Sequence, residues 1–279
     1  MSGTPGAGRV RAVLLDIDDT LVDTRAAFAA AIDAMATAWL PHLDAAGRVA
    51  ATAHWVADRQ GAFRAYTRGE LTMEQQRRAR VADLHVAFGG RALDDEAWAA
   101  WQDGYLAAFS AAWRLRPGVL AVLDRLAEAG LPVGAVTNAS RALSEDKLGR
   151  LGLAARVPVL SAVDDRGVGK PDPRMFLVAC EALGCEPSAA LYVGDEADVD
   201  ALGAARCGLT GVWLDALLEE EAAARVWRAA LGAAAAAGVH PQRLHRVSSL
   251  EQILTLPGLR GGAGAGCENG FGSGEGGTV

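Results

Sequence analysis

The chain has few cysteines, no long apolar stretch and no excess of basic residues. Its four cysteines show neither the paired spacing of a metal site nor the density of a disulfide-rich secreted scaffold. They are Cys180, Cys185, Cys207 and Cys267. We interpret them as reduced thiols of a cytoplasmic protein, which excludes a small disulfide-stabilised fold.

No segment approaches the roughly 18 uninterrupted apolar residues of a membrane-spanning helix. The apolar run near the N-terminus stops at Asp16 without a small-residue cleavage site, so we expect no signal peptide. The formal charge is -7, from 27 basic and 34 acidic residues that are interspersed along the chain. This balance argues against nucleic acid as a partner.

Apolar sequence is plentiful, because hydrophobic residues make up 51% of the 279 residues, enough for one substantial core. Short apolar runs rich in branched side chains recur and are typical of buried strands. They span residues 11–15, 131–138, 157–163, 190–195, 210–215 and, more weakly, 244–247. Five or six strands are therefore expected.

Helical segments separate these runs. Pro117 is expected to start a helix that Gly130 stops, Ser140 can cap another, and Pro173 begins a third that ends near Gly184. This alternation predicts an α/β fold, a Rossmann-like doubly wound parallel sheet with helices on both faces. Such sheets bind their ligands beyond the carboxyl ends of the strands.

Residues 24–114 interrupt the alternation, because they carry helix-period apolar positions and no convincing strand. Breaks near Pro41, Gly69 and Gly89–Gly90 predict four helices, a small bundle that covers the sheet as a lid. Five tryptophans are expected in its core: Trp39, Trp55, Trp98, Trp101 and Trp113.

The predicted domain division follows from these patterns. Residues 1–22 and 115–260 form the Rossmann-like core, and residues 23–114 form the helical cap. The glycine-rich tail, residues 261–279, is expected to be disordered because it has almost no large apolar residue.

Paired carboxylates follow the first strand. Asp16 and Asp18 stand two residues apart, so both can reach the same crevice. A cation between them relieves their repulsion, and magnesium is the natural cation for hard oxygen ligands. A second acidic cluster, residues 194–200, follows a later strand. A helix N-terminus explains one or two of its acids, whereas metal ligation explains the excess.

Two further polar segments lie at strand ends or in loops. Thr137 and Asn138 can donate hydrogen bonds to an anion, although capping of the next helix explains such a pair equally well. Lys170 lies in a loop stiffened by Pro171 and Pro173, which suits a lysine that must be aimed. The alternative is a solvated lysine before a helix start.

Taken in order, four segments closely resemble the signature motifs of the haloacid dehalogenase superfamily. They are DIDDT (16–20), VTN (136–138), GKPDP (169–173) and GDEADVD (194–200). The resemblance covers residues 11–215. The helical insert follows the first motif, as a small helical cap does in some members of the superfamily.

The resemblance implies a mechanism. Asp16 would attack phosphorus and form an aspartyl-phosphate, while Asp18 protonates the leaving oxygen and then activates water. Thr137, Asn138 and Lys170 would hold the phosphoryl oxygens. The implied Mg²⁺ ligands are Asp16, the backbone carbonyl of Asp18 and Asp195. Asp200 would lie behind them as a metal residue that contacts the ion through water or orients a ligand, with Asp198 as the alternative to Asp200.

These roles predict a magnesium-dependent phosphatase for a small phosphorylated metabolite, either a sugar phosphate or a nucleoside monophosphate. Dehalogenase and phosphonate-cleaving relatives lack an acid two residues after the nucleophile, so Asp18 argues against both activities. A sugar phosphomutase of the same superfamily and a non-catalytic binding protein that retains the fold stay open as alternatives.

The basic residues Arg64, Arg68 and those in 75–80 could contact substrate, but a charged solvent-facing surface is the preferred interpretation.

Overall fold

Six strands form one parallel sheet within residues 9–259, which the computed structural model describes. The strands are β1 (Ala12–Leu15), β2 (Val133–Thr137), β3 (Val159–Ala162), β4 (Ala190–Gly194), β5 (Thr210–Leu214) and β6 (Leu244–Val247). Their order is β3-β2-β1-β4-β5-β6, and every neighbouring pair is parallel. The predicted α/β fold is confirmed, and each expected run contains a strand.

The sheet is doubly wound. From β1 the chain winds outward through β2 to β3, then crosses to β4 on the other side of β1 and continues to β6. The order therefore reverses between β1 and β4, the place where open α/β sheets bind ligands. The helices of this part are α6 (Val119–Glu128), α7 (Arg141–Arg150), α8 (Pro173–Ala182), α9 (Gly203–Arg206) and α10 (Glu220–Ala236).

Most helix ends follow the predicted signals. Helix α8 begins at Pro173, and α6 ends just before Gly130, whose φ of 66° lies in the left-handed region. Ser140 is the N-cap residue of α7, but its side chain forms no capping hydrogen bond. The Asp164 carboxylate instead accepts the hydrogen bond of the Arg141 backbone N–H.

Both faces of the sheet are buried, which explains why the strands are continuous apolar runs rather than alternating ones. On one face, Leu14 and Tyr192 belong to a core that includes Phe176 of α8. On the other, Val13 belongs to a core that includes Val122 of α6 and extends into the helical region after β1.

Five helices lie between β1 and α6 in the described part of the chain, one more than predicted. They are α1 (Thr24–Trp39), α2 (Ala45–Ala57), α3 (Ala62–Thr67), α4 (Met73–Ala87) and α5 (Asp95–Ala111). The unpredicted break separates α2 from α3, where Asp58 and Gly61 both have positive φ. The Asp58 carboxylate accepts the N–H of Phe63, so one residue ends α2 and stabilises the start of α3.

Aromatic rings fill the interior of this helical region. Trp101 is buried and stacks against Trp98, and Trp55 packs at a tilt against Trp101. Trp113 is buried at the other end of α5, whereas Trp39 is only partly buried. The core position predicted for the tryptophans is confirmed for four, and Trp39 packs at the edge.

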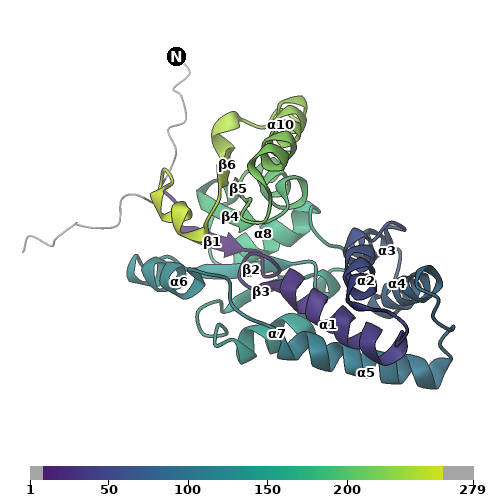
Figure 1. Ribbon diagram of the computed structural model, residues 1–279. Coiled ribbons are helices and arrows are strands. Elements are labelled where there is room, and N and C mark those ends of the chain that lie inside the picture. Colours follow the sequence, from purple (N-terminus) through teal and green to yellow (C-terminus); the bar gives the residue numbers. More distant parts are fainter. Residues whose placement is uncertain (1–8, 260–279) are drawn as a thin grey trace, which may run out of the picture.

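Figure 1 shows α1 to α5 gathered on one side of the molecule, away from β6 and α10. None of the helices within residues 9–259 is long and apolar enough to cross a membrane. The tail predicted to be disordered, residues 261–279, lies outside the described residues.

Candidate active site

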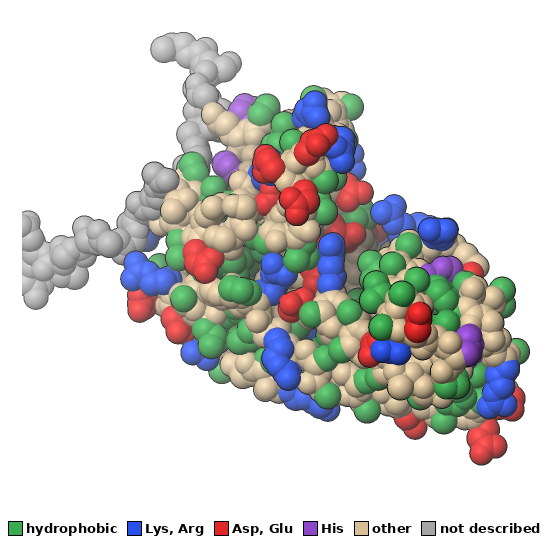
Figure 2. Space-filling view, in the orientation of Figure 1, with side chains coloured by type: hydrophobic (Ala, Val, Ile, Leu, Met, Phe, Trp, Pro, Cys, Tyr) green, Lys and Arg blue, Asp and Glu red, His purple; other side chains and the backbone are tan. Residues whose placement is uncertain are grey.

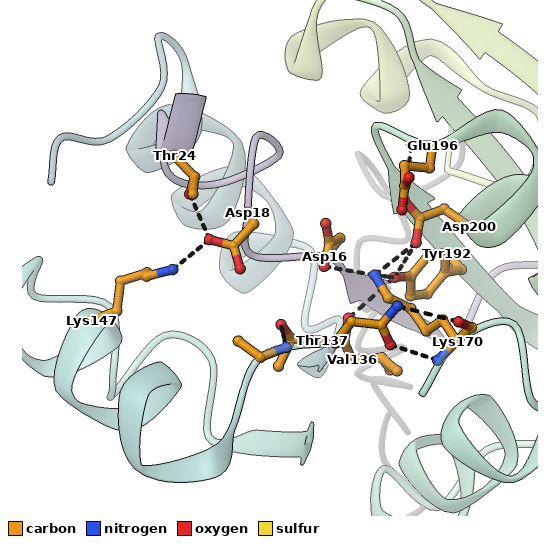
Figure 3. A network of polar contacts seen from close by, with 12 residues as sticks. Asp16, Asp18, Thr24, Val136, Thr137, Lys147, Lys170, Tyr192, Glu196 and Asp200 are labelled. Carbon is orange, nitrogen blue, oxygen red and sulfur yellow. Dashed lines mark hydrogen bonds and ion pairs between the residues drawn. The ribbon is translucent and has the colours of Figure 1, made fainter. Parts of the chain in front are cut away.

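The four motifs meet at the carboxyl ends of β1, β2 and β4. Strand β1 lies between the other two, and its last residue, Leu15, is level with Ala135 and Val193. Residues that follow these strands are therefore neighbours at one edge of the sheet. The motif side chains gathered there are Asp16, Thr137, Lys170, Asp195 and Asp200. Figure 3 labels Asp16, Thr137, Lys170 and Asp200 of this group.

Three carboxylates form a compact cluster. One oxygen each from Asp16, Asp195 and Asp200 lies within 4.8 Å of the others. Asp200 is fully buried in a π-helical turn, Ala197–Leu202, whereas Asp198 in the same turn is exposed. The structure thus brings Asp200 into the cluster and leaves Asp198 outside it.

Gly194 makes room for this arrangement at the end of β4. A Cβ atom at that position would lie 2.2 Å from the carboxyl carbon of Asp200, closer than any real contact. The backbone N–H of Glu196 donates to Asp200 Oδ2 at 3.0 Å and holds the carboxylate in place. A side chain at position 194 would therefore displace one member of the cluster.

The electrostatics of the cluster suit a cation. Burial raises the pKa of Asp16 well above its usual value, and the charge of Asp200 adds to the effect while Lys170 opposes it. The pKa of Asp195 is likewise raised, by burial and then by Asp200 and Asp16. Three hard oxygen donors that destabilise one another's charge fit a divalent cation such as Mg²⁺.

Asp195→Asn is expected to raise the thermal stability of the metal-free protein at neutral pH. The pKa of Asp195 is higher in the folded protein than in the unfolded chain, where it is about 4. The protonated carboxyl therefore stabilises the folded state below about pH 4, and this stabilisation is lost as pH rises through the folded-state pKa. The amide removes this penalty, and each 1 kcal/mol gained corresponds to about 2–4 °C in Tm.

Thermal unfolding scans in the presence of a chelator measure this effect. The difference in Tm between Asp195→Asn and wild type should grow from about pH 4 to about pH 7. Asp198→Asn is the matched control, since that exposed side chain lies outside the cluster. A lower Tm for Asp195→Asn at neutral pH would show that repulsion does not dominate at this position.

Lys170 bridges two of the carboxylates. Its Nζ donates to Asp16 Oδ1 and to Asp200 Oδ1, both at 2.7 Å, and lies 3.0 Å from the Tyr192 hydroxyl. Burial alone would lower the pKa of this ammonium, but Asp16 and Asp200 raise it well above its usual value. Lys170 is therefore a fixed positive charge beside Asp16.

The loop that carries Lys170 is held by Asn138. The Asn138 amide oxygen accepts the Lys170 backbone N–H at 2.6 Å, and its amide nitrogen donates to the Lys170 carbonyl at 3.2 Å. Gly169 permits the contact, since a Cβ there would lie 2.4 Å from the Asn138 amide oxygen. Asn138 thus orients the lysine loop, and its predicted contact with phosphate stays a prediction.

Thr137 lies fully buried at the end of β2, beside Asp16 and Lys170 (Figure 3). Its hydroxyl oxygen accepts the backbone N–H of Ala139 at 3.0 Å. That contact leaves the hydroxyl proton free to donate, as the predicted role at a phosphoryl oxygen requires.

Asp18 is held by two residues that the motifs do not contain. Its Oδ1 accepts hydrogen bonds from Thr24 Oγ1, at 2.5 Å, and from Lys147 Nζ. Lys147 is 1% exposed, and its Nζ lies 5.6 Å from the ring centroids of both Phe109 and Trp113. Figure 3 shows Thr24 and Lys147 on one side of Asp18 and Asp16 on the other.

Lys147 lies outside the four motifs, but the amino-acid composition gives a reason to single it out. Among 27 lysines and arginines, only positions 147 and 170 are lysine, and the structure places both against carboxylates of the first motif. In a chain that otherwise uses arginine, a lysine marks a position where a compact ammonium is needed.

A model of the haloacid dehalogenase-like hydrolase family matches residues 10–208, a span that contains all four motifs. The chain belongs to this family. The predicted resemblance is therefore confirmed, and with it the assignment of the chain as a hydrolase.

Several proteins similar to this chain are phosphatases by name. N-acetylmuramic acid 6-phosphate phosphatase of Pseudomonas aeruginosa is 33% identical over 67% of this chain and 74% of its own length. Glyceraldehyde 3-phosphate phosphatase of Methanopyrus kandleri is 38% identical over 34% of this chain, a match that spans 41% of that protein. The HAD-hydrolase YfnB from Bacillus subtilis, solved with magnesium, shares the fold with a TM-score of 0.69 and 20% identity, covering 90% of this chain and 99% of YfnB.

The site of this haloacid dehalogenase-like hydrolase opens into a cavity of about 1030 Å³ between the sheet and α2 to α5. Figure 2 shows acidic side chains deep in this hollow and basic ones at its rim. Arg64, Arg68, Arg77 and Arg80 line the cavity, whereas Arg78 does not. The interpretation of residues 75–80 as a solvent-facing surface was wrong for Arg77 and Arg80, because the helical period turns these two inward.

Proposed function

We propose that this hydrolase is a magnesium-dependent phosphatase that cleaves the monoester of a small phosphorylated metabolite through an aspartyl-phosphate at Asp16. The observation that carries the proposal is the pair Asp16 and Asp18 at one cavity, with Lys170 against the first and Lys147 against the second. Ester cleavage requires a proton donor for the departing oxygen in addition to the nucleophile, whereas carbon–halogen cleavage requires the nucleophile alone. The phosphatases among its relatives also support the proposed phosphatase activity.

In the first step, a carboxylate oxygen of Asp16 forms a bond to phosphorus and the ester P–O bond breaks. Asp18 gives its proton to the departing oxygen, which leaves as an alcohol. In the second step, water attacks phosphorus, Asp18 takes its proton, and the bond between phosphorus and Asp16 breaks. Inorganic phosphate and the starting carboxylate are regenerated.

The remaining residues stabilise charge in both steps. Lys170 and the Thr137 hydroxyl neutralise and orient the phosphoryl oxygens. Asp16, Asp195, Asp200 and the Asp18 carbonyl would hold Mg²⁺, which supplies positive charge beside the transferred group. Because Lys170 occupies Asp16 Oδ1, the Oδ2 atom stays available to react.

Lys147 acts as a positioning residue for Asp18. By binding Oδ1 together with Thr24, it leaves Oδ2 free to face the leaving oxygen. Burial raises the pKa of Asp18, but the charge and hydrogen bond of Lys147, with the contributions of Thr24 and Lys170, together outweigh burial and lower the net pKa. This suits the base step directly, while the negative charge of a bound phosphate raises the pKa again for the acid step.

Lys147→Met is expected to reduce kcat by about 10- to 100-fold. Methionine fills a similar volume between Phe109 and Trp113 without a charge, so the helix should stay packed. Because Lys147 acts through Asp18, adding Lys147→Met to Asp18→Asn should cause little further loss. Steady-state kinetics of the single and double variants measure this, and equal losses in both backgrounds would indicate a structural role instead.

Phosphate release with Mg²⁺ from p-nitrophenyl phosphate and from a panel of phosphorylated metabolites tests the proposed function. Activity should disappear with a chelator and return with Mg²⁺. A phosphomutase would instead convert one sugar phosphate into its isomer, which ³¹P NMR distinguishes from hydrolysis. No phosphate release from any ester would contradict the proposal.

The helical cap over residues 23–114, the sugar or nucleoside substrate class and the cytoplasmic location stay predictions.

A further inference from the structure

Two arginines on the helical side of the cavity are engaged within the chain. Arg68 pairs with Glu70, and Arg80 stacks 4.0 Å from the ring centroid of Trp55 while donating to its carbonyl at 2.6 Å. Arg80 Nε also lies 3.5 Å from the Asp58 carboxylate, so each of these two guanidinium groups has a carboxylate partner within the chain.

Arg77 differs from both. It lines the cavity, and within residues 9–259 it forms no ion pair with a carboxylate. Its contacts are the Met73 sulfur, 3.6 Å from Nη2, and the face of Tyr105, whose centroid lies 5.4 Å from Cζ. Burial lowers the pKa of this guanidinium. A partly buried cation without a counter-charge is unfavourable until a ligand supplies one.

Gln76, the neighbour of Arg77, carries a second unmatched group. Its side chain is buried on the same cavity wall, and Nε2 lies 3.0 Å from the Met73 sulfur. Its Oε1 is buried and has no hydrogen-bond partner among the described residues. A buried acceptor without a partner is energetically unfavourable.

Tyr105 connects this pair to the reacting groups. Its ring lies under Arg77, and burial together with the charge of Asp18 raises the pKa of its hydroxyl to about 12. Arg77 and Asp18 both act on this tyrosine, and both line the same cavity. A small molecule that fills this cavity can meet both Asp18 and Arg77.

We propose that Arg77, with Gln76 beside it, binds a second anionic group of the substrate, a carboxylate or a further phosphate, distal to the phosphoryl group that Asp16 attacks. The inference rests on the proposed phosphatase function. A guanidinium binds either anion through paired N–H donors, and Gln76 Oε1 accepts from a hydroxyl or amide near that anion. The substrate class is a small phosphate monoester with a second acidic group, rather than a neutral sugar phosphate.

Matched substrates test this subsite in the full chain with Mg²⁺. Phosphoglycerate and glycerol phosphate, with the phosphate on the terminal carbon, differ only in a carboxylate and a hydroxymethyl group. Fructose bisphosphate and fructose phosphate form the second pair, for a further phosphate. In Arg77→Met, the kcat/KM ratio of the acidic to the neutral ester should fall about 10- to 100-fold in at least one pair. The pair that responds identifies the anion.

Two further variants make the result specific. Arg77→Lys keeps the charge but loses the paired donors, so its ratio should be intermediate. Arg78→Met is the matched control, because Arg78 is the next residue of α4, pairs with Glu74 and lies outside the cavity lining. Arg77→Met should fold, since it replaces an unpaired cation with an apolar side chain, and thermal unfolding checks this.

The outcomes separate the two proposals. If the wild type hydrolyses the esters, two results would overturn the subsite. One is an acidic-to-neutral kcat/KM ratio that is unchanged in Arg77→Met, and the other is a ratio that falls equally in Arg78→Met. If the wild type releases no phosphate from these esters or from p-nitrophenyl phosphate, the proposed function fails and the subsite fails with it.

Discussion

Asp16→Asn is expected to reduce kcat by about 10⁴-fold or more, because it removes the nucleophile. The amide has nearly the same shape as the carboxylate, so the cluster with Asp195 and Asp200 should persist. It cannot form the acyl-phosphate bond, and hydrolysis would have to proceed by direct attack of water. Steady-state release of phosphate at saturating Mg²⁺ measures the loss.

The control for this variant is Asp103→Asn, which changes an exposed carboxylate of α5 that lies outside the cavity lining. It should keep activity within about twofold of wild type, as surface substitutions away from a site do. Isothermal titration with Mg²⁺ shows whether Asp16→Asn has also lost the metal. Activity near the wild-type level in Asp16→Asn would remove Asp16 from the mechanism.

Asp18→Asn is expected to slow the cleavage of esters with poor leaving groups more than that of esters with good leaving groups. Protonation by a positioned acid contributes about 10²- to 10⁴-fold, and it matters most where the departing oxygen is a poor leaving group. The first turnover with an alkyl phosphate should therefore slow far more than the first turnover with p-nitrophenyl phosphate. Rapid-quench measurement of alcohol release gives both rates.

The same variant lacks the base of the second step. With p-nitrophenyl phosphate, a burst of nitrophenolate equal to the enzyme concentration should precede slow turnover, since the phosphorylated enzyme accumulates. Thr20→Ser is a conservative control nearby, at a position whose hydroxyl has no hydrogen-bond partner among the described residues. Equal slowing of the first turnover for all leaving groups would contradict the acid role of Asp18.

The sheet and the motif positions were predictable because they depend on local patterns. A strand buried on both faces is a continuous apolar run, so residues 11–15 and 190–195 reveal their strands without tertiary information. Parallel strands deliver their carboxyl ends to one edge, which brings Asp16 next to Asp195 wherever their strands pair. The convergence of the motifs follows from topology.

The contacts of helical side chains were not predictable in the same way. Lys147 lies within an ordinary polar helix sequence, and only the packing of α7 against Phe109 and Trp113 turns it toward Asp18. Arg77 and Arg78 are adjacent and chemically identical, yet one faces the cavity and the other a surface ion pair. Sequence periodicity could not set the rotation of α4, because its apolar face is weakly defined.

The break between α2 and α3 was missed for a related reason. Asp58 adopts a left-handed backbone that is uncommon outside glycine, and its own carboxylate stabilises the following helix. A lone glycine at position 61 is a weak signal on its own. The tertiary position of Arg80, 3.5 Å from the Asp58 carboxylate, also favours the turn there, and this contact is not visible in the sequence.

The central claim is a covalent bond between Asp16 and phosphorus, and mass spectrometry after rapid acid quench tests it most directly. The enzyme is mixed with p-nitrophenyl phosphate and Mg²⁺, quenched within the first turnover and digested. We expect one added phosphoryl group on the peptide that contains Asp16, in greater amount in Asp18→Asn and absent in Asp16→Asn. A phosphoryl group on another residue, or phosphate released by a fully active enzyme that is never phosphorylated, would contradict the mechanism.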